Sequence, residues 1–216
     1  MFDVGALPYA FLTAQPTWRA HGGELASLTK LAPGAHVLDL GCGPGESAFG
    51  MIDREPHARV TGLDYSASMI RFANLRRQFE PLRDRIGFVE GDAMKLPFDD
   101  ASFDAATGHS FLYLVPDAHQ VLREVARVLK PGGRCAFLEP SGTPGASIPM
   151  EIAARALREP RFVTSMALWR IVSRGYGRFD DARFRASFAQ AGLEFVEARS
   201  TLAGLGLFGV AEKRRG

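Results

Sequence analysis

Three glycines at alternate positions form the pattern in this sequence that is best suited to ligand chemistry. Residues 36–40 (HVLDL) read as a short apolar strand, and Gly41, Gly43 and Gly45 follow it directly. Glycine lets the backbone approach a ligand with no side chain in between. A helix is expected from about Glu46, so the segment predicts a strand, a glycine loop and a helix in succession.

Two aspartates stand where the next two expected strands end. Asp64 follows the strand expected over 59–63, and Asp92 follows the strand expected over 86–90. A carboxylate at the end of the second strand is placed to bind ribose hydroxyls. Asp92 is placed to accept a hydrogen bond from an exocyclic amine. The alternative without a ligand is a tight strand–helix turn.

The charges around the loop indicate which nucleotide is bound. The dinucleotide pattern G-x-G-x-x-G needs glycine at position 46, where this chain has Glu46. A pyrophosphate binds best at a helix N-terminus without negative charge. We expect Asp39, Glu46, Asp64 and Asp92 to gather here, which favours a cationic ligand without phosphate. A nicotinamide-dependent dehydrogenase is the disfavoured alternative.

Strands and helices alternate along the first two thirds of the chain, which predicts an α/β fold with a parallel sheet between two helical layers. A loop rich in Gly, Pro and Ser follows, then helices on both sides of Pro160 and a helix that ends near Gly192. The chain closes with two apolar runs that read as a hairpin. The expected strands are 36–40, 59–63, 86–90, 103–107, 134–138, 194–201 and 205–212.

Composition favours one globular domain over residues 1–216. The chain is 46% hydrophobic and its net charge is +2, too small to indicate nucleic-acid binding. Cys42 and Cys135 form no C-x-x-C pair, so neither a metal site nor a disulfide framework is expected. Cysteine usage favours the cytoplasm. No apolar run approaches the roughly 20 residues of a membrane span.

Four stretches together resemble the class I S-adenosylmethionine-dependent methyltransferases. They are VLDLGCGPGES (37–47), VTGLDYSASMI (60–70), GDAMKLPFDDASFDAA (91–106) and LKPGGRCAFLEP (129–140). The closest similarity is to the small-molecule branch with quinone, sterol, phospholipid and natural-product enzymes. This resemblance implies S-adenosyl-L-methionine as the cofactor. It also implies a Rossmann-like, doubly wound, seven-stranded sheet, mostly parallel with a C-terminal antiparallel strand, plus a helical lid.

The resemblance also implies roles for single residues. The three glycines would line the methionine and ribose part of the cofactor, with Asp39 beneath them. Asp64 would hold the ribose hydroxyls, while other residues would contact the adenine or lie near the transferable methyl group. The implied cofactor-binding residues are Asp39, Gly41, Gly43, Gly45, Asp64, Tyr65, Met69, Asp92, Ala93 and His109.

The reaction is expected to be an in-line displacement, in which a nucleophile takes the electrophilic methyl group from sulfur. An oxygen or carbon nucleophile also needs a general base, whereas an amine needs only to arrive unprotonated. His109 and Tyr113 are the expected catalytic residues, with His21 and Glu139 as further base candidates. A purely structural role for His109 in the cofactor pocket is the open alternative.

Two lid segments, approximately 1–31 and 141–180, are expected to cover the acceptor. Their bulky residues favour a partly apolar acceptor of quinone or natural-product type. Tyr9, Trp18, Arg19 and Trp169 are the expected substrate contacts.

The charge of the second lid segment leaves other functions open. Between positions 151 and 190 there are eight arginines and four acidic residues. This surplus suits peripheral contact with anionic lipid, and hence a phospholipid N-methyltransferase, although a solvated helix face has the same pattern. A cofactor-binding module without catalysis is the third alternative, and the oligomeric state is left open.

Overall fold

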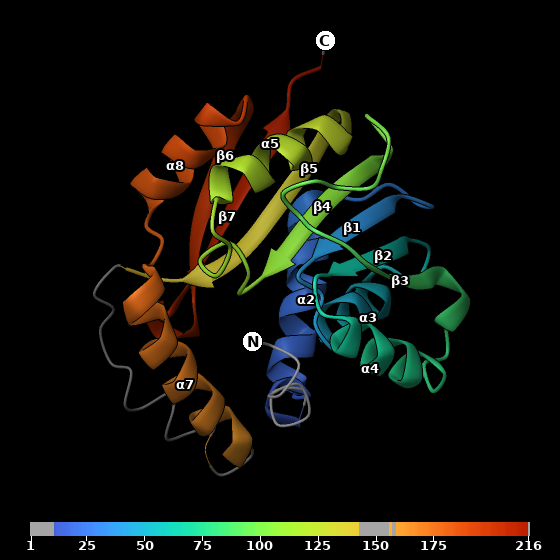
Figure 1. Ribbon diagram of the computed structural model, residues 1–216, viewed down its shortest axis with the longest axis vertical. Coiled ribbons are helices and arrows are strands. Elements are labelled where there is room, and N and C mark those ends of the chain that lie inside the picture. Colours follow the sequence, from blue (N-terminus) through green and yellow to red (C-terminus); the bar gives the residue numbers. More distant parts are fainter. Residues whose placement is uncertain (1–10, 143–155, 157–158, 216) are drawn as a thin grey trace.

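A seven-stranded sheet forms the centre of the protein, in the order β3-β2-β1-β4-β5-β7-β6 (Figure 1). The computed structural model describes residues 11–142, 156 and 159–215. β7 runs antiparallel to β5 and β6, and the other neighbouring pairs are parallel. The predicted fold class is therefore confirmed. The strands are β1 (His36–Leu40), β2 (Arg59–Asp64), β3 (Ile86–Glu90), β4 (Phe103–His109), β5 (Leu129–Pro140), β6 (Leu193–Thr201) and β7 (Gly206–Lys213).

Helices cover both faces of the sheet because successive strand residues alternate between two apolar layers. Val37 belongs to the core under α2, α3 and α4, whereas Leu38 belongs to the core under α5 and α8. α7 lies beside the end of β5, apart from most of the sheet (Figure 1). The helices are α2 (Pro16–Thr29), α3 (Glu46–Arg54), α4 (Ala67–Arg77), α5 (Ala118–Val128), α7 (Pro160–Tyr176) and α8 (Asp181–Gln190).

Helix boundaries follow the local sequence. Ser66, Asp117 and Asp180 each cap a helix by accepting a hydrogen bond from the backbone of its first turn. None of the described helices is both long enough and apolar enough to cross a membrane.

Two strands differ from the sequence-based expectation by more than one residue at an end. β5 begins at Leu129, because Leu129 already pairs with Phe103 before an irregularity at the Lys130–Gly133 turn. β4 extends to His109, which pairs with Leu138. The helix expected before Pro160 falls mostly outside the described residues.

α2 docks on α3 with backbone against backbone. A Cβ atom on Gly22 would lie 2.2 Å from the carbonyl oxygen of Ser47, and one on Gly50 would lie 1.8 Å from that of Arg19. No side chain fits at either position, so glycine sets the closeness of this contact. The contact fixes α2 against the part of the fold that follows the glycine loop.

Candidate functional site

The glycine loop lies at the carboxyl end of β1, where the strand order reverses between β1 and β4. Gly41, Gly43 and Gly45 have φ values of +62°, +50° and +91°, in the left-handed region that favours glycine. The backbone N–H of Gly43 donates to Asp64 Oδ2 over 2.9 Å. The N–H of Cys42 donates to the carbonyl of Leu63 over 3.1 Å, so β2 holds the loop in place. A doubly wound sheet binds its ligand at this kind of crevice.

Asp39 is a fully buried carboxylate beneath the loop. Its Oδ1 accepts from Thr107 Oγ1 at 3.1 Å and from Ser47 Oγ at 3.5 Å, while its Oδ2 has no hydrogen-bond partner among the described residues. Burial raises the pKa of Asp39 to about 7, against the opposing effect of the two hydroxyl donors. An unpartnered buried carboxylate oxygen is costly unless a donor or a cation meets it. Asp39 is therefore suited to a positively charged ligand.

Asp64 completes the acidic side of the loop. Its Oδ1 accepts from the N–H of Ser66 at 2.9 Å, in addition to the bond from Gly43. Burial raises the pKa of Asp64, and the two backbone donors oppose that rise. Because a carboxylate can accept about four hydrogen bonds, Asp64 retains capacity for hydroxyl donors.

The residues expected around an adenine differ in exposure. Tyr65 is 77% exposed, while Met69 and Ala93 are buried. Asp92 Oδ1 accepts from the N–H of Met94 at 2.8 Å, which shapes the loop after β3. The structure thus places Tyr65 on the loop after β2, Met69 in the first turn of α4, and Asp92 and Ala93 on the loop after β3, with Tyr65 open to solvent.

Glu46 does not add an uncompensated charge to the site, contrary to the sequence-based expectation. Its carboxylate is paired with Arg76 of α4, and Arg76 also donates to the carbonyl of Pro44 over 3.0 Å. The uncompensated negative charge around the loop therefore comes from Asp39 and Asp64. The charges around the loop therefore argue less strongly against pyrophosphate binding than the sequence indicated, because the guanidinium of Arg76 lies beside the loop.

A cluster of imidazole and indole rings lies at the end of β4. His109 Nε2 is 3.5 Å from His21 Nδ1, and Ser110 Oγ is 3.0 Å from His109 Nδ1. The ring of His109 packs edge-on against Trp18 with centroids 4.9 Å apart. Burial lowers the pKa of His109 to about 4, so this imidazole is neutral at physiological pH. α2 and β4 thereby bring together two of the expected base candidates.

Trp18 also contacts the second expected lid segment. Its ring centroid lies 5.9 Å from that of Trp169 in α7, in an edge-to-face arrangement. Both indole Nε1 atoms are buried and lack a hydrogen-bond partner among the residues the structure describes. A buried tryptophan N–H usually finds a partner, so two such donors in contacting rings indicate a place for acceptor atoms of a ligand.

Glu139 is a structural carboxylate in this arrangement, unlike the base candidate expected from the sequence. It is fully buried and accepts from the backbone N–H groups of Phe111, Leu112 and Tyr113 at 3.1, 2.8 and 3.2 Å. Burial raises its pKa to about 7. Glu139 holds the loop after β4, and with it the buried Tyr113, rather than facing an acceptor.

Arg19 lies away from the aromatic cluster. Its guanidinium forms ion pairs with Asp53 of α3 and with Glu80, and it lies 5.7 Å from the ring centre of Phe49. The structure therefore assigns Arg19 to the packing of α2 against α3. Tyr9 lies outside the described residues. Among residues 11–142, 156 and 159–215, no three His, Cys, Asp or Glu side chains form a group that could hold a metal ion.

Three residues near the loop were missed by sequence reasoning. Thr107 is the hydroxyl partner of Asp39, and Arg76 is the partner of Glu46. The ring of Phe111 covers Gly41 so closely that a Cβ there would lie 2.3 Å from Phe111 Cδ2. The sequence offers a signal only for Phe111, which follows the candidate residue His109 by two positions. The contacts of Thr107 and Arg76 join segments that are distant in the sequence.

The fold and this site define a class of protein: a Rossmann-like domain with a bare backbone loop and buried carboxylates suited to a cationic adenosyl cofactor. Comparison with known families gives the same result, because residues 38–137 match the family described as "Methyltransferase domain". This match indicates a methyltransferase domain of the S-adenosylmethionine-dependent type over just under half of the chain, with S-adenosyl-L-methionine as the cofactor.

Individual relatives agree with this assignment. The chain is 44% identical over 126 residues to the ubiquinone/menaquinone biosynthesis C-methyltransferase UbiE of Paracoccus denitrificans, covering 56% of this chain and 49% of that protein. It is 42% identical over 114 residues to the 27-O-demethylrifamycin SV methyltransferase of Amycolatopsis mediterranei, covering 53% and 42%. The chain thus spans about half the length of these curated relatives.

A solved structure extends the similarity to the whole fold. A putative S-adenosyl-L-methionine-dependent methyltransferase from Methanococcus maripaludis superposes with a TM-score of 0.75 at 20% identity. The match covers 100% of this chain and 95% of that one. At this identity the match establishes the fold alone.

Proposed function

We propose that this protein transfers the methyl group of S-adenosyl-L-methionine to a small, partly apolar acceptor of quinone or natural-product type that carries oxygen atoms. The observation that carries the acceptor class is the ring cluster of Trp18, His21, His109 and Trp169, whose two indole N–H groups have no partner within the described part of the chain. The names of the two curated relatives, a quinone and a rifamycin methyltransferase, support the same class.

In this proposal the glycine loop and its carboxylates hold the cofactor. Gly41, Gly43 and Gly45 leave the backbone open to it, Asp39 faces its positive charge and Asp64 accepts from its ribose hydroxyls. The adenine is flanked by Tyr65 after β2, Met69 in α4, and Asp92 and Ala93 after β3. When bound, the cofactor supplies an electrophilic methyl group on a positively charged sulfur.

On the acceptor side, the indole N–H groups of Trp18 and Trp169 donate to acceptor oxygens, and the surrounding rings exclude water. His109 is neutral over the physiological pH range because its pKa is about 4, so its ring can accept a hydrogen bond from an acceptor hydroxyl. As the hydroxyl oxygen bonds to the methyl group its proton becomes strongly acidic, and the weakly basic ring can then take it. His21, 3.5 Å from His109, is placed to take up or return that proton. Ser110 orients the opposite nitrogen of the His109 ring.

Turnover of labelled S-adenosyl-L-methionine tests the proposal on a panel of hydroxylated naphthoquinols, phenolic polyketides and phosphatidylethanolamine vesicles. We expect transfer to members of the first two groups. His109→Gln should lower kcat about 10²-fold or more if His109 acts as the base. The wild-type rate should show no inflection from His109 above about pH 5. An unchanged kcat in His109→Gln would reduce His109 to shaping the pocket.

Tryptophan variants isolate the two donors. Trp18→Phe and Trp169→Phe keep an aromatic ring but remove the N–H group. Each should raise KM for oxygen-bearing acceptors about tenfold and leave calorimetric binding of the demethylated cofactor unchanged. Cofactor binding without turnover on any acceptor would instead identify a cofactor-binding module.

The surface of α7 favours a second candidate, a phospholipid N-methyltransferase at the membrane surface. Leu168 and Ile171 are 43% and 64% exposed, and the exposed Arg174 lies one turn from Ile171. Apolar residues flanked by arginine suit an anionic lipid interface. Transfer to phosphatidylethanolamine vesicles, with salt-sensitive vesicle binding, would favour this candidate over the first.

A further inference from the structure

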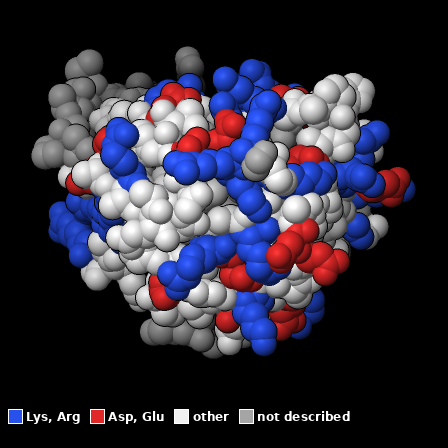
Figure 2. Space-filling model, turned by 90° about the horizontal axis from the view of Figure 1, so that it is seen from above, with Lys and Arg blue, Asp and Glu red and all other residues white. Residues whose placement is uncertain are grey.

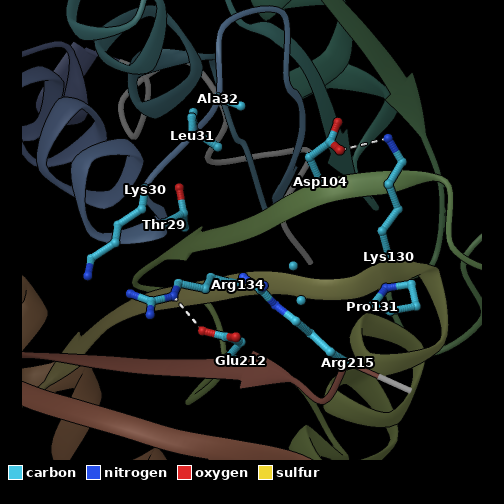
Figure 3. A pocket seen from close by; sticks show the side chains of 12 residues that line it. Thr29, Lys30, Leu31, Ala32, Asp104, Lys130, Pro131, Arg134, Glu212 and Arg215 are labelled. Carbon is cyan, nitrogen blue, oxygen red and sulfur yellow. Dashed lines mark hydrogen bonds and ion pairs between the residues drawn. The ribbon is translucent and has the colours of Figure 1, made fainter.

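A pocket lies at the opposite end of the parallel strands from the glycine loop. Its volume is about 320 Å³, close to the lower end of the range for small-molecule sites. It is formed where α2 leads into β1, where β4 and β5 begin and where β7 ends. Twelve residues line it, with those of the α2–β1 link facing those of β5 and β7 (Figure 3).

The lining is strongly cationic. It contains four basic residues, Lys30, Lys130, Arg134 and Arg215, and two acidic residues, Asp104 and Glu212. This gives a net charge of +2 in one pocket, equal to that of the whole chain. Lys and Arg side chains also gather over much of the face on the side of the C-terminus (Figure 2).

The acidic residues use most of their capacity on other partners. Asp104 Oδ1 binds Lys130 Nζ at 2.7 Å, and Asp104 Oδ2 accepts from the N–H of His36 at 2.8 Å. Glu212 Oε2 accepts from Arg134 Nε at 2.8 Å, which leaves the two terminal nitrogens of Arg134 for other acceptors. Lys130 and Arg134 are thus partly neutralised by these two carboxylates.

Lys30 and Arg215 supply the uncompensated charge. Neither forms an ion pair with any residue that the structure describes, although both line the pocket. Arg215 lies across the turn before Arg134, with its Nε 3.1 Å from the position of a Cβ on Gly132. Figure 3 shows Lys30, Arg134 and Arg215 reaching the same pocket from three different segments.

Lys30 is held in an unusual backbone conformation. It follows the last turn of α2 with φ +53° and ψ +54°, where glycine is the common residue because other side chains are strained there. A lysine in this position directs a cation into the pocket at a conformational cost.

We propose that this pocket binds the phosphate group of a small soluble anion, at a site separate from that of the methyl donor. Arginine forks match phosphate oxygens in pairs, and a lysine adds a point charge. Three cations around one concave pocket suit a multivalent anion better than a single carboxylate.

Pyrophosphate and inorganic phosphate are the probes, titrated calorimetrically into the full chain in phosphate-free buffer at constant ionic strength. We expect saturable pyrophosphate binding, and thermal unfolding that moves to higher temperature as its concentration rises. The double variant Lys30→Gln/Arg215→Gln should weaken pyrophosphate binding about tenfold or more.

A matched control distinguishes binding in the pocket from a nonspecific effect of removing two positive charges. Lys95→Gln/Arg83→Gln removes one lysine and one arginine that are exposed elsewhere, so it should bind pyrophosphate like the wild type. The demethylated cofactor should bind equally to all three proteins, which shows that each is folded.

Two results would overturn the proposal. Equal loss of pyrophosphate binding in both double variants would indicate a diffuse charge effect. Binding to vesicles that contain phosphatidic acid, without saturable binding of either soluble phosphate, would assign the cations to a membrane contact instead.

Discussion

The cofactor side of the site is made mainly of backbone, whereas the acceptor side is made of side chains. Around the glycine loop, Gly43 and Asp64 meet through a backbone N–H, and the loop lies within a short stretch of sequence. Around His109, the rings of Trp18 and Trp169 come from helices about 150 residues apart. One region is local in sequence and the other depends on the tertiary fold.

The family match covers the first of these regions but only part of the second. The family match, residues 38–137, contains the loop, Asp64, Asp92 and His109, but neither α2 nor α7. Methyl-donor binding is thus defined by the shared part of the chain. The proposed acceptor contacts on α2 and α7 lie outside the matched residues. Substitutions in the two regions test this division, from the largest expected effect to the smallest.

Gly50→Ala should have the largest effect, because its Cβ would meet the carbonyl oxygen of Arg19 at 1.8 Å and force α2 away from α3. We expect a loss of about 3 kcal/mol in the free energy of unfolding, measured by urea denaturation. Gly87→Ala is the control, since nothing lies within 4 Å of its Cβ position. Equal effects from the two substitutions would remove the case for a tight α2–α3 contact.

Asp64→Ala should weaken binding of the demethylated cofactor about 100-fold, because it removes a carboxylate that orders the loop and accepts from the ribose. Calorimetry measures this, and the ring cluster should be unaffected. Glu90→Ala is a matched control, because Glu90 pairs with Asp64 in the sheet register but is exposed. Near-normal affinity in Asp64→Ala would contradict the division between the two regions.

Asp39 should make cofactor affinity depend on pH. A cationic ligand favours the ionised carboxylate, so wild-type affinity should rise about tenfold between pH 5.5 and 7.5 and binding should release a proton. Titrations in buffers of different ionisation enthalpy measure that proton. Asp39→Asn should bind more weakly and without this pH dependence. A proton release that persists in the variant would point to another group.

The stability of the free protein should move in the opposite direction. The pKa of Asp39 is raised from 3.8 to about 7, so between these values the folded state binds more protons than the unfolded state. The contribution of Asp39 to stability therefore falls as pH rises from about 4 to 7. Glu139 acts with the same sign, so Asp39→Asn should reduce this slope without abolishing it.

Arg19→Met should have the smallest effect, a loss of about 1 kcal/mol in stability from its partly exposed ion pairs with Asp53 and Glu80. KM for the acceptor should not change. Thermal unfolding and steady-state kinetics measure both. A raised KM at unchanged stability would instead support the contact between Arg19 and the acceptor that the sequence predicted.

The sequence predicts the cofactor side well because its determinants are local. Alternating apolar residues define the strands, and the glycines and Asp64 stand at fixed distances from them. The two partners that it misses, Thr107 for Asp39 and Arg76 for Glu46, each lie at least 30 residues away in the chain. Such pairings follow from strand order and helix placement, which single-residue patterns do not encode.

On the acceptor side, residue type was informative but orientation was not. Trp18 and Trp169 were expected as substrate contacts from their bulk alone, and the structure brings them into contact with each other. Arg19 is adjacent to Trp18 in sequence, yet a helix turns adjacent side chains by about 100°. Its guanidinium consequently faces α3 and Glu80 instead of the ring cluster.

The glycine contact between α2 and α3 constrains how this protein could bind larger acceptor molecules. Since Gly22 and Gly50 bring the two helix backbones into close contact, α2, which carries Trp18 and His21, cannot move closer to α3. Space for a bulkier acceptor must therefore come from α7, through displacement or truncation of Trp169. Efforts to broaden the range of accepted compounds should therefore start with a library on α7 and leave α2 unchanged.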